Sequence, residues 1–110
     1  MTIQHKGLAT GGWSKLTLPE QLANVGSEVE RTISWREKGN YLYSRKAFER
    51  ALELLSLTKN SHKDETSLKE ITRIYEFLVD YFDGKNLFAS TDETWRNYFR
   101  GYTYFSRIKL

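Results

Sequence analysis

Cysteine is absent from the 110 residues, and proline and methionine each occur only once. Without cysteine, the chain can form neither a disulfide framework nor a thiolate metal site. No purely apolar run exceeds about three residues, far below the roughly 20 residues needed to cross a bilayer. The stretch Met1 to Gly12 also lacks the apolar core of a secretion signal, so the sequence predicts a cytoplasmic protein that does not span a membrane.

The composition is that of a folded protein with a small surplus of positive charge. Hydrophobic residues make up 39% and charged residues 28%, and the net charge is +3. This balance is typical of one soluble globular domain and argues against disorder. The surplus permits a nucleic-acid partner but is too small to predict one.

Helix-start patterns recur along the chain. A hydroxyl residue is followed three positions later by Glu at Thr17 and Glu20, at Ser67 and Glu70, and at Ser90 and Glu93. In such a capping box each side chain satisfies a free backbone N–H of the other residue. Together with the apolar spacing, these patterns predict helices over about 18–38, 41–59, 68–83 and 91–107.

The connections between these helices are short, which favours neighbouring antiparallel helices. Gly39 and Asn40 suit a left-handed helix end followed by the cap of the next helix. The sequence therefore predicts an all-α, up-down antiparallel four-helix bundle over residues 17–110. Residues 1–16 show no helical spacing and are expected to form an extended N-terminal arm, either flexible or docked.

The predicted core includes an apolar stripe on the first helix, with Gly26 at its edge, where the missing side chain would let another helix cross closely. On the last helix, an aromatic arc is expected to lie in the core: Trp95, Tyr98, Phe99, Tyr102 and Phe105.

A basic ridge is expected on another side of the last helix. Arg96, Arg100 and Arg107 share a stripe, and Tyr104 lies beside it. Such a stripe is most often a solvated surface, and the alternative is a ridge that contacts phosphates of RNA or DNA.

A polar face on the first helix is the other candidate binding surface. Asn24, Glu28, Arg31 and Trp35 follow one another at helical spacing, so that Glu28 can bond Arg31 and Arg31 can stack on Trp35. One interpretation is surface decoration that shields the tryptophan. The other is a partner interface, because Trp and Arg are enriched among binding hot spots.

Motifs for catalysis or cofactor binding are not evident. The glycine-rich stretch 7–12 is followed by Trp13, where a phosphate-binding loop requires Lys. The two histidines fall in the expected arm and in a loop, and the paired ligands of a bundle metal site are missing. The sequence therefore predicts no catalytic residues, no cofactor and no metal.

Several segments carry a resemblance to known proteins: Gly11-Gly12-Trp13, the run from Glu20 to Arg31 continuing to Trp35, Gly39-Asn40, the run from Ala47 to Leu54, and Ser90-Thr91-Asp92-Glu93 with Trp95. In these segments the chain resembles a family of short, uncharacterised prokaryotic helical proteins, a likeness that implies a shared pattern and no activity. In size and helix number it is also similar to the bacterial four-helix proteins encoded in intervening sequences of ribosomal RNA.

The leading functional hypothesis is a non-enzymatic helical module that binds other proteins, including copies of itself, through Asn24, Glu28, Arg31 and Trp35. The alternative hypothesis is an accessory RNA- or DNA-binding protein that uses the basic ridge.

Overall fold

The computed structural model describes residues 11–107, and side chains as far as Ser106. Within this range the chain forms helices and no strands. A short 3₁₀ helix, η2 (Trp13–Lys15), precedes four α-helices: α1 (Leu18–Glu37), α2 (Tyr41–Ser61), α3 (Glu65–Asp83) and α4 (Asp92–Arg107). The predicted all-α fold is confirmed. Residues 1–10 of the predicted arm lie outside the described residues.

The start of α1 and the turn into α2 have the predicted local structure. Thr17 Oγ1 accepts the N–H of Glu20, and Glu20 Oε1 accepts the N–H of Thr17, which completes the capping box. Gly39 adopts a φ of +77°, which an L side chain rarely takes. Asn40 Oδ1 then accepts the N–H of Tyr43 at 3.0 Å and caps α2. Local sequence therefore determines this reversal.

The predicted caps of α3 and α4 were wrong. Asp64, three residues before Ser67, caps α3 by accepting the N–H of Ser67 at 2.9 Å. Hydrogen bonds from the side chain and the N–H of Ser67 lower the pKa of the Asp64 carboxyl. The hydroxyl of Thr91 accepts the N–H of Thr94 and caps α4. Ser90 instead donates its N–H to Asn86 Oδ1 in the preceding loop.

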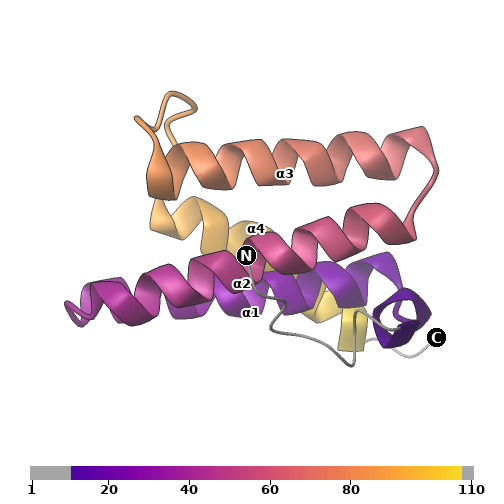
Figure 1. Ribbon diagram of the computed structural model, residues 1–110, viewed down its shortest axis with the longest axis horizontal. Helices are drawn as coiled ribbons and strands as arrows, with labels where there is room; N and C mark the ends of the chain where they lie inside the picture. The colour runs from indigo at the N-terminus through magenta and orange to yellow at the C-terminus, as the bar shows by residue number, and fades with distance from the viewer. Residues whose placement is uncertain (1–10, 108–110) are drawn as a thin grey trace.

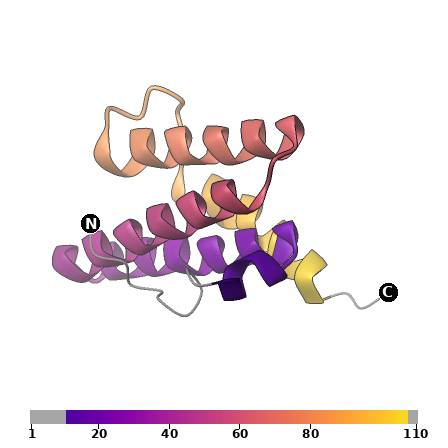
Figure 2. The ribbon, with the colours of Figure 1, turned by 45° about the vertical axis from the view of Figure 1, so that its right-hand side comes forward.

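The helices alternate in direction around the bundle. Ser44 on α2 bonds the Thr32 carbonyl on α1, and Arg45 near the start of α2 pairs with Asp83 at the end of α3. Figures 1 and 2 show α1 behind α2, α3 on the opposite side of α2 from α1, and α4 behind, crossing α1. The two turns α1–α2 and α3–α4 thus lie at the same end of the bundle.

The core is continuous and draws on all four helices. Its buried hydrophobic members are Trp13, Leu22, Val25, Val29, Ile33, Phe48, Ala51, Leu54, Leu55, Ile71, Ile74, Leu78, Trp95 and Phe99. One predicted core residue, Phe105, is instead 63% exposed. Tyr98 bonds Glu70 near the start of α3. Because α4 runs antiparallel to α3, Phe105, about 10 Å further along α4, lies past the first residue of α3 and has no part of that helix to pack against.

Gly26 lies where α1 and α4 cross closely. A Cβ atom at this position would lie 2.6 Å from Cβ of Phe99 on α4, closer than real Cβ contacts come. The prediction that a helix crosses closely at Gly26 is confirmed, and the crossing helix is α4. The crossing requires the absence of a side chain at this position.

Residues 11–16, the first part of the described chain, pack against the bundle through Trp13. Trp13 is buried, and its indole N–H donates to Thr58 Oγ1 on α2 at 3.0 Å. Its carbonyl accepts from Gln21 Nε2, and Gln21 Oε1 lies 2.7 Å from Nε2 of His62. His62, which the sequence placed in a loop, therefore has a structural contact.

One polar cluster connects three helices at the end of the bundle that carries both turns. Asp92 at the start of α4 accepts hydrogen bonds from Arg36 on α1 and Tyr81 on α3. Partial burial acts to raise the pKa of Asp92, but the bonds from Arg36 and Tyr81 outweigh it and hold the pKa below its ordinary value. The carboxylate therefore stays ionised and ties α4 to α1 and α3.

Candidate functional site

Glu28, predicted on the polar face of α1, lies between α1 and α2. It is 6% exposed, and its two carboxylate oxygens accept from Arg31 Nη1 at 2.6 Å and from Arg50 Nε on α2 at 2.9 Å. Asn24 is exposed and donates to the Glu20 carbonyl. Glu28 therefore joins two helices within this chain, and the predicted four-residue face is not one open surface.

The side chains around Trp35 differ from those predicted. The cation over its ring is Lys38, with Nζ 5.0 Å from the ring centroid, where the sequence suggested Arg31. The ring of Tyr43 meets Trp35 edge-on at 5.1 Å, and Lys46 Nζ lies 5.5 Å from the Tyr43 centroid. The turn between α1 and α2 brings these side chains together.

The same turn exposes large hydrophobic side chains. Tyr41 is 70% exposed and Leu42 65%, while Tyr43 is about half exposed. We refer to Trp35, Tyr41, Leu42 and Tyr43 as the α1–α2 corner. The sequence carried a signal for it, since Tyr41-Leu42-Tyr43 is an apolar run at a helix start, where helical spacing cannot bury all three residues.

The basic ridge on α4 is partly neutralised. Arg96 forms two bonds to the Glu30 carboxylate, at 2.8 and 3.0 Å, and a third contact to Glu37 at 3.2 Å. These carboxylates raise the pKa of Arg96. Arg100 donates to Asn97 on its own helix, and Tyr104 is exposed. The Arg107 side chain lies outside the described residues.

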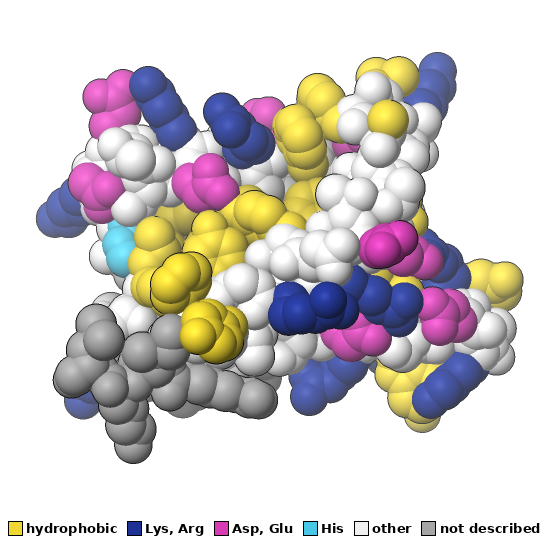
Figure 3. Space-filling model, turned by 180° about the vertical axis from the view of Figure 1, so that it is seen from behind, with side chains coloured by type: hydrophobic (Ala, Val, Ile, Leu, Met, Phe, Trp, Pro, Cys, Tyr) yellow, Lys and Arg dark blue, Asp and Glu magenta, His cyan; other side chains and the backbone are white. Residues whose placement is uncertain are grey.

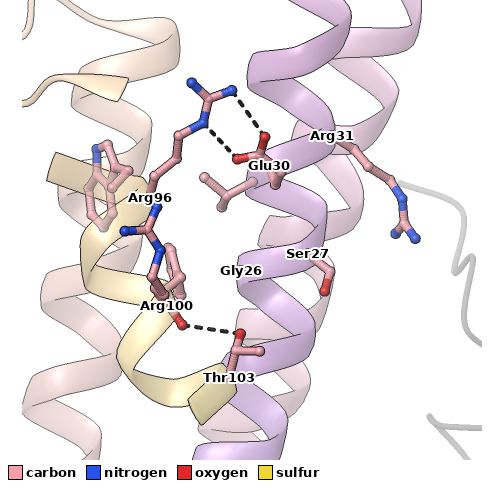
Figure 4. A pocket seen from close by; sticks show the side chains of 10 residues that line it. Gly26, Ser27, Glu30, Arg31, Arg96, Arg100 and Thr103 are labelled. Carbon is pink, nitrogen blue, oxygen red and sulfur yellow. Dashed lines mark hydrogen bonds and ion pairs between the residues drawn. The ribbon is translucent and has the colours of Figure 1, made fainter. Parts of the chain in front are cut away.

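A surface groove of about 520 Å³ runs along the contact between α1 and α4, next to this ridge. Gly26 and Phe99 line its base, and Arg96, Arg100 and Arg31 lie along it. Figure 4 shows Arg31 directed away from Arg96 and Arg100, so the three cations do not converge on one point. The groove has the positive charge for an anion but not a focused binding geometry.

A second hollow, of about 260 Å³, lies between α3 and α4 and is mostly apolar. Ile74 and Phe77 on α3 and Trp95 and Tyr98 on α4 form its walls, and Phe88 closes one side. In the view from behind, hydrophobic side chains form a band across this face of the molecule (Figure 3). The hollow could not be predicted from the sequence, because it depends on the spacing of α3 from α4.

Polar groups around the hollow are few. The Tyr98 hydroxyl donates to Glu70 on α3 and lies 3.2 Å from the Tyr102 hydroxyl. Burial raises the pKa of Tyr98, and the bond to Glu70 raises it further. Tyr98 therefore stays protonated at neutral pH and acts here as a structural donor. Arg73 stands at the rim.

The loop from α3 to α4 is tightly bonded although it exposes apolar side chains. Both carboxylate oxygens of Asp80 accept loop N–H groups, from Leu87 at 2.7 Å and Phe88 at 3.1 Å. The side chain of Asn86 bonds both the N–H and the carbonyl of Ser90. Asn86 and Ala89 each have a φ of +54°, an uncommon conformation for residues with a Cβ.

Trp95 and Trp13 are both buried but differ in hydrogen bonding. Among the described residues, Trp95 Nε1 is a buried side-chain donor without an acceptor, whereas Trp13 Nε1 bonds Thr58. Replacing either residue with Phe removes the same atoms. We expect Trp13→Phe to lower the free energy of unfolding by about 1 kcal/mol beyond the loss in Trp95→Phe, because only Trp13→Phe removes a buried hydrogen bond, which leaves Thr58 Oγ1 with its bond to the Leu54 carbonyl alone. Urea unfolding of both variants measures the difference, and equal losses would contradict this reading.

The described residues contain no group of three or more His, Cys, Asp or Glu side chains that could hold a metal ion. None of the helices in that part of the chain combines the length and the hydropathy needed to cross a membrane.

Comparison of the chain with known protein families, with curated proteins and with solved structures finds no match. The resemblance to short prokaryotic helical proteins therefore stays a prediction, and functional inference depends on the surfaces described above.

Proposed function

We propose that this protein is a helical interaction module that binds another protein through the α1–α2 corner. The observation that carries the proposal is the exposure of Tyr41, Leu42 and Tyr43 beside Trp35. Tyr and Trp are enriched at binding hot spots, because they supply a large rigid contact area. Of the two predicted anchors, Trp35 belongs to this corner and Arg31 lies one helical turn before it on α1, where it bonds Glu28. Glu28 itself joins α1 to α2 through Arg50.

The charge around the corner indicates the kind of partner. Lys38 and Lys46 lie over the rings of Trp35 and Tyr43. No ion pair involving either lysine is found among the described residues, whereas Arg45 beside them pairs with Glu49 and Asp83. Two such corners facing each other would bring like charges together. A partner segment with acidic and apolar side chains fits better.

Binding of RNA or DNA by Arg96, Arg100, Tyr104 and Arg107 has less support. Arg96 is held by Glu30 and Glu37, so a phosphate would have to displace two carboxylates. We therefore prefer the protein-binding function.

The test is affinity capture with matched variants. Leu42→Glu places a charge in the corner, and Leu87→Glu makes the same change at a similarly exposed leucine in the α3–α4 loop. We expect wild type and Leu87→Glu to capture the same partner. Leu42→Glu should bind that partner with an affinity lower by at least about tenfold, which corresponds to roughly 1.4 kcal/mol. Identical capture by wild type and Leu42→Glu would contradict the proposed surface.

A further inference from the structure

The hollow between α3 and α4 has the size and the walls of a site for one aromatic ring. Its volume is about 260 Å³. A closed apolar cavity of roughly 150 Å³ can hold benzene, so this hollow has room for one ring and a short tail. The aromatic side chains that line it are Phe77, Phe88, Trp95 and Tyr98. Phe77 and Phe88 stack with ring centroids 4.0 Å apart, and a ligand ring beside them would gain further contacts between aromatic rings.

Two side chains of opposite charge also line this hollow. Glu70 and Arg73 are three residues apart on α3, so they share one face of that helix. Phe77 lies two turns after Glu70 on the same face, about 10 Å further along the helix axis. The hollow therefore has a charged end and an aromatic end.

Neither charge is neutralised by an ion pair in the described part of the chain. The Tyr98 hydroxyl donates to Glu70 Oε1, but no contact of Glu70 Oε2 or of the Arg73 guanidinium is found among the described residues. The neighbouring Lys69, in contrast, pairs with Glu65 at 3.0 Å. Glu70 can therefore accept hydrogen bonds from a ligand cation, and Arg73 can donate to a ligand anion.

These two charges restrict the polar group of the ligand. A carboxylate alone would bind Arg73 but would lie near the Glu70 carboxylate, and an ammonium group alone would be repelled by Arg73. A free α-amino acid carries an ammonium and a carboxylate group on the same carbon atom, whereas a residue within a peptide carries neither. A free amino acid with an aromatic side chain thus matches both ends of the hollow.

We propose that the α3–α4 hollow binds a free aromatic α-amino acid. The ring lies beside Phe77 and Phe88, the ammonium group lies at Glu70, and the carboxylate lies at Arg73. The bond from Tyr98 orients the Glu70 carboxylate before the ligand arrives. This site is separate from the α1–α2 corner and does not depend on the proposed protein-binding function.

The first test is a titration of the full chain with L-phenylalanine, followed through the indole N–H signals in NMR spectra. The chain has three tryptophans, and Trp95→Phe identifies the signal of Trp95, which lines the hollow. We expect this signal to shift with a Kd of about 1 mM or lower, while the Trp35 signal stays in place. Phenethylamine lacks the carboxylate and 3-phenylpropanoate lacks the ammonium group, so each should bind at least about tenfold more weakly. No shift of the Trp95 signal at about 10 mM L-phenylalanine, or equal affinity for the three compounds, would overturn the proposal.

Two variants test the charged contacts separately. Arg73→Gln should weaken binding of L-phenylalanine at least about tenfold without weakening that of phenethylamine, which has no carboxylate. Glu70→Gln should weaken L-phenylalanine similarly without weakening 3-phenylpropanoate. Lys69→Gln, the matched control, removes the same charge from α3 outside the hollow and should bind as wild type does. Unchanged affinity in Arg73→Gln, or an equal loss in Lys69→Gln, would refute the proposed contacts.

A third variant tests the hollow without changing a charge. Thr94 is exposed on α4 and lines the hollow, so Thr94→Phe fills the space without removing a core side chain. We expect this variant to keep the circular dichroism spectrum of wild type and to lose the shift of the Trp95 signal. Binding of L-phenylalanine to folded Thr94→Phe at wild-type affinity would show that the ligand lies elsewhere.

Discussion

Replacing Gly26 with alanine is expected to destabilise the protein by about 2 kcal/mol, which lowers Tm by roughly 10 °C in a domain of this size. The added Cβ would lie 2.6 Å from Cβ and 2.8 Å from Cγ of Phe99. Neither atom is the far end of a flexible side chain, so α4 must move away from α1. Alanine favours the helix by up to about 1 kcal/mol relative to glycine, and the clash must exceed this gain.

Gly101 provides the matched control for this substitution. It also lies in a helix, α4, but a Cβ there would meet nothing within 4 Å. Gly101→Ala should therefore stabilise the protein by about 0.5 to 1 kcal/mol. Thermal unfolding followed by circular dichroism measures both. If Gly26→Ala and Gly101→Ala shift Tm in the same direction, the close crossing of α1 and α4 is not as described.

Replacing Glu28 with glutamine is expected to lower the free energy of unfolding by about 2 to 3 kcal/mol. Removing one member of a buried ion pair costs about 3 to 5 kcal/mol, and the estimate is reduced because Arg31 and Arg50 are partly exposed. Glutamine keeps the size of the side chain but leaves two guanidinium groups with a neutral partner. The loss should come from separation of α1 from α2.

Glu30→Gln is the control for this second prediction. Glu30 makes two bonds to Arg96, with geometry as good as that at Glu28, but about half of its side chain is exposed. Exposed pairs contribute about 0 to 1 kcal/mol, so Glu30→Gln should have a small effect. Urea denaturation of both variants provides the comparison. Equal losses for Glu28→Gln and Glu30→Gln would contradict the structural role of Glu28.

The sequence predicted those features that depend on neighbouring residues. The capping box of Thr17 and Glu20 and the reversal at Gly39 and Asn40 are made within a few positions, and both are confirmed. Gly26 was also found, because a glycine beside an apolar stripe signals a close approach wherever the other helix comes from. The start of α3 was missed, since Asp64 and Ser67 both fit a helix cap and the sequence alone does not choose between them.

The candidate surfaces were harder to predict, because they depend on contacts between distant residues. Glu28 was predicted to lie on an exposed polar face, but in the structure it is buried and bonds Arg50, which lies 22 positions later in the sequence. Arg96 was predicted to lie on an exposed basic ridge, because its partner Glu30 is 66 positions away in the sequence and no local pattern connects them. The hollow lined by Phe77, Phe88 and Trp95 depends on how α3 and the α3–α4 loop lie against α4. Local periodicity describes one helix at a time and contains none of this information.

Site-specific photo-crosslinking tests most directly the claim that exposed hydrophobic surfaces of this bundle bind other chains. A benzophenone side chain would be placed at position 42 and, in a second protein, at position 87. We expect position 42 to crosslink to a protein partner that position 87 does not reach. No crosslinking from position 42, or the same products from both positions, would contradict the account.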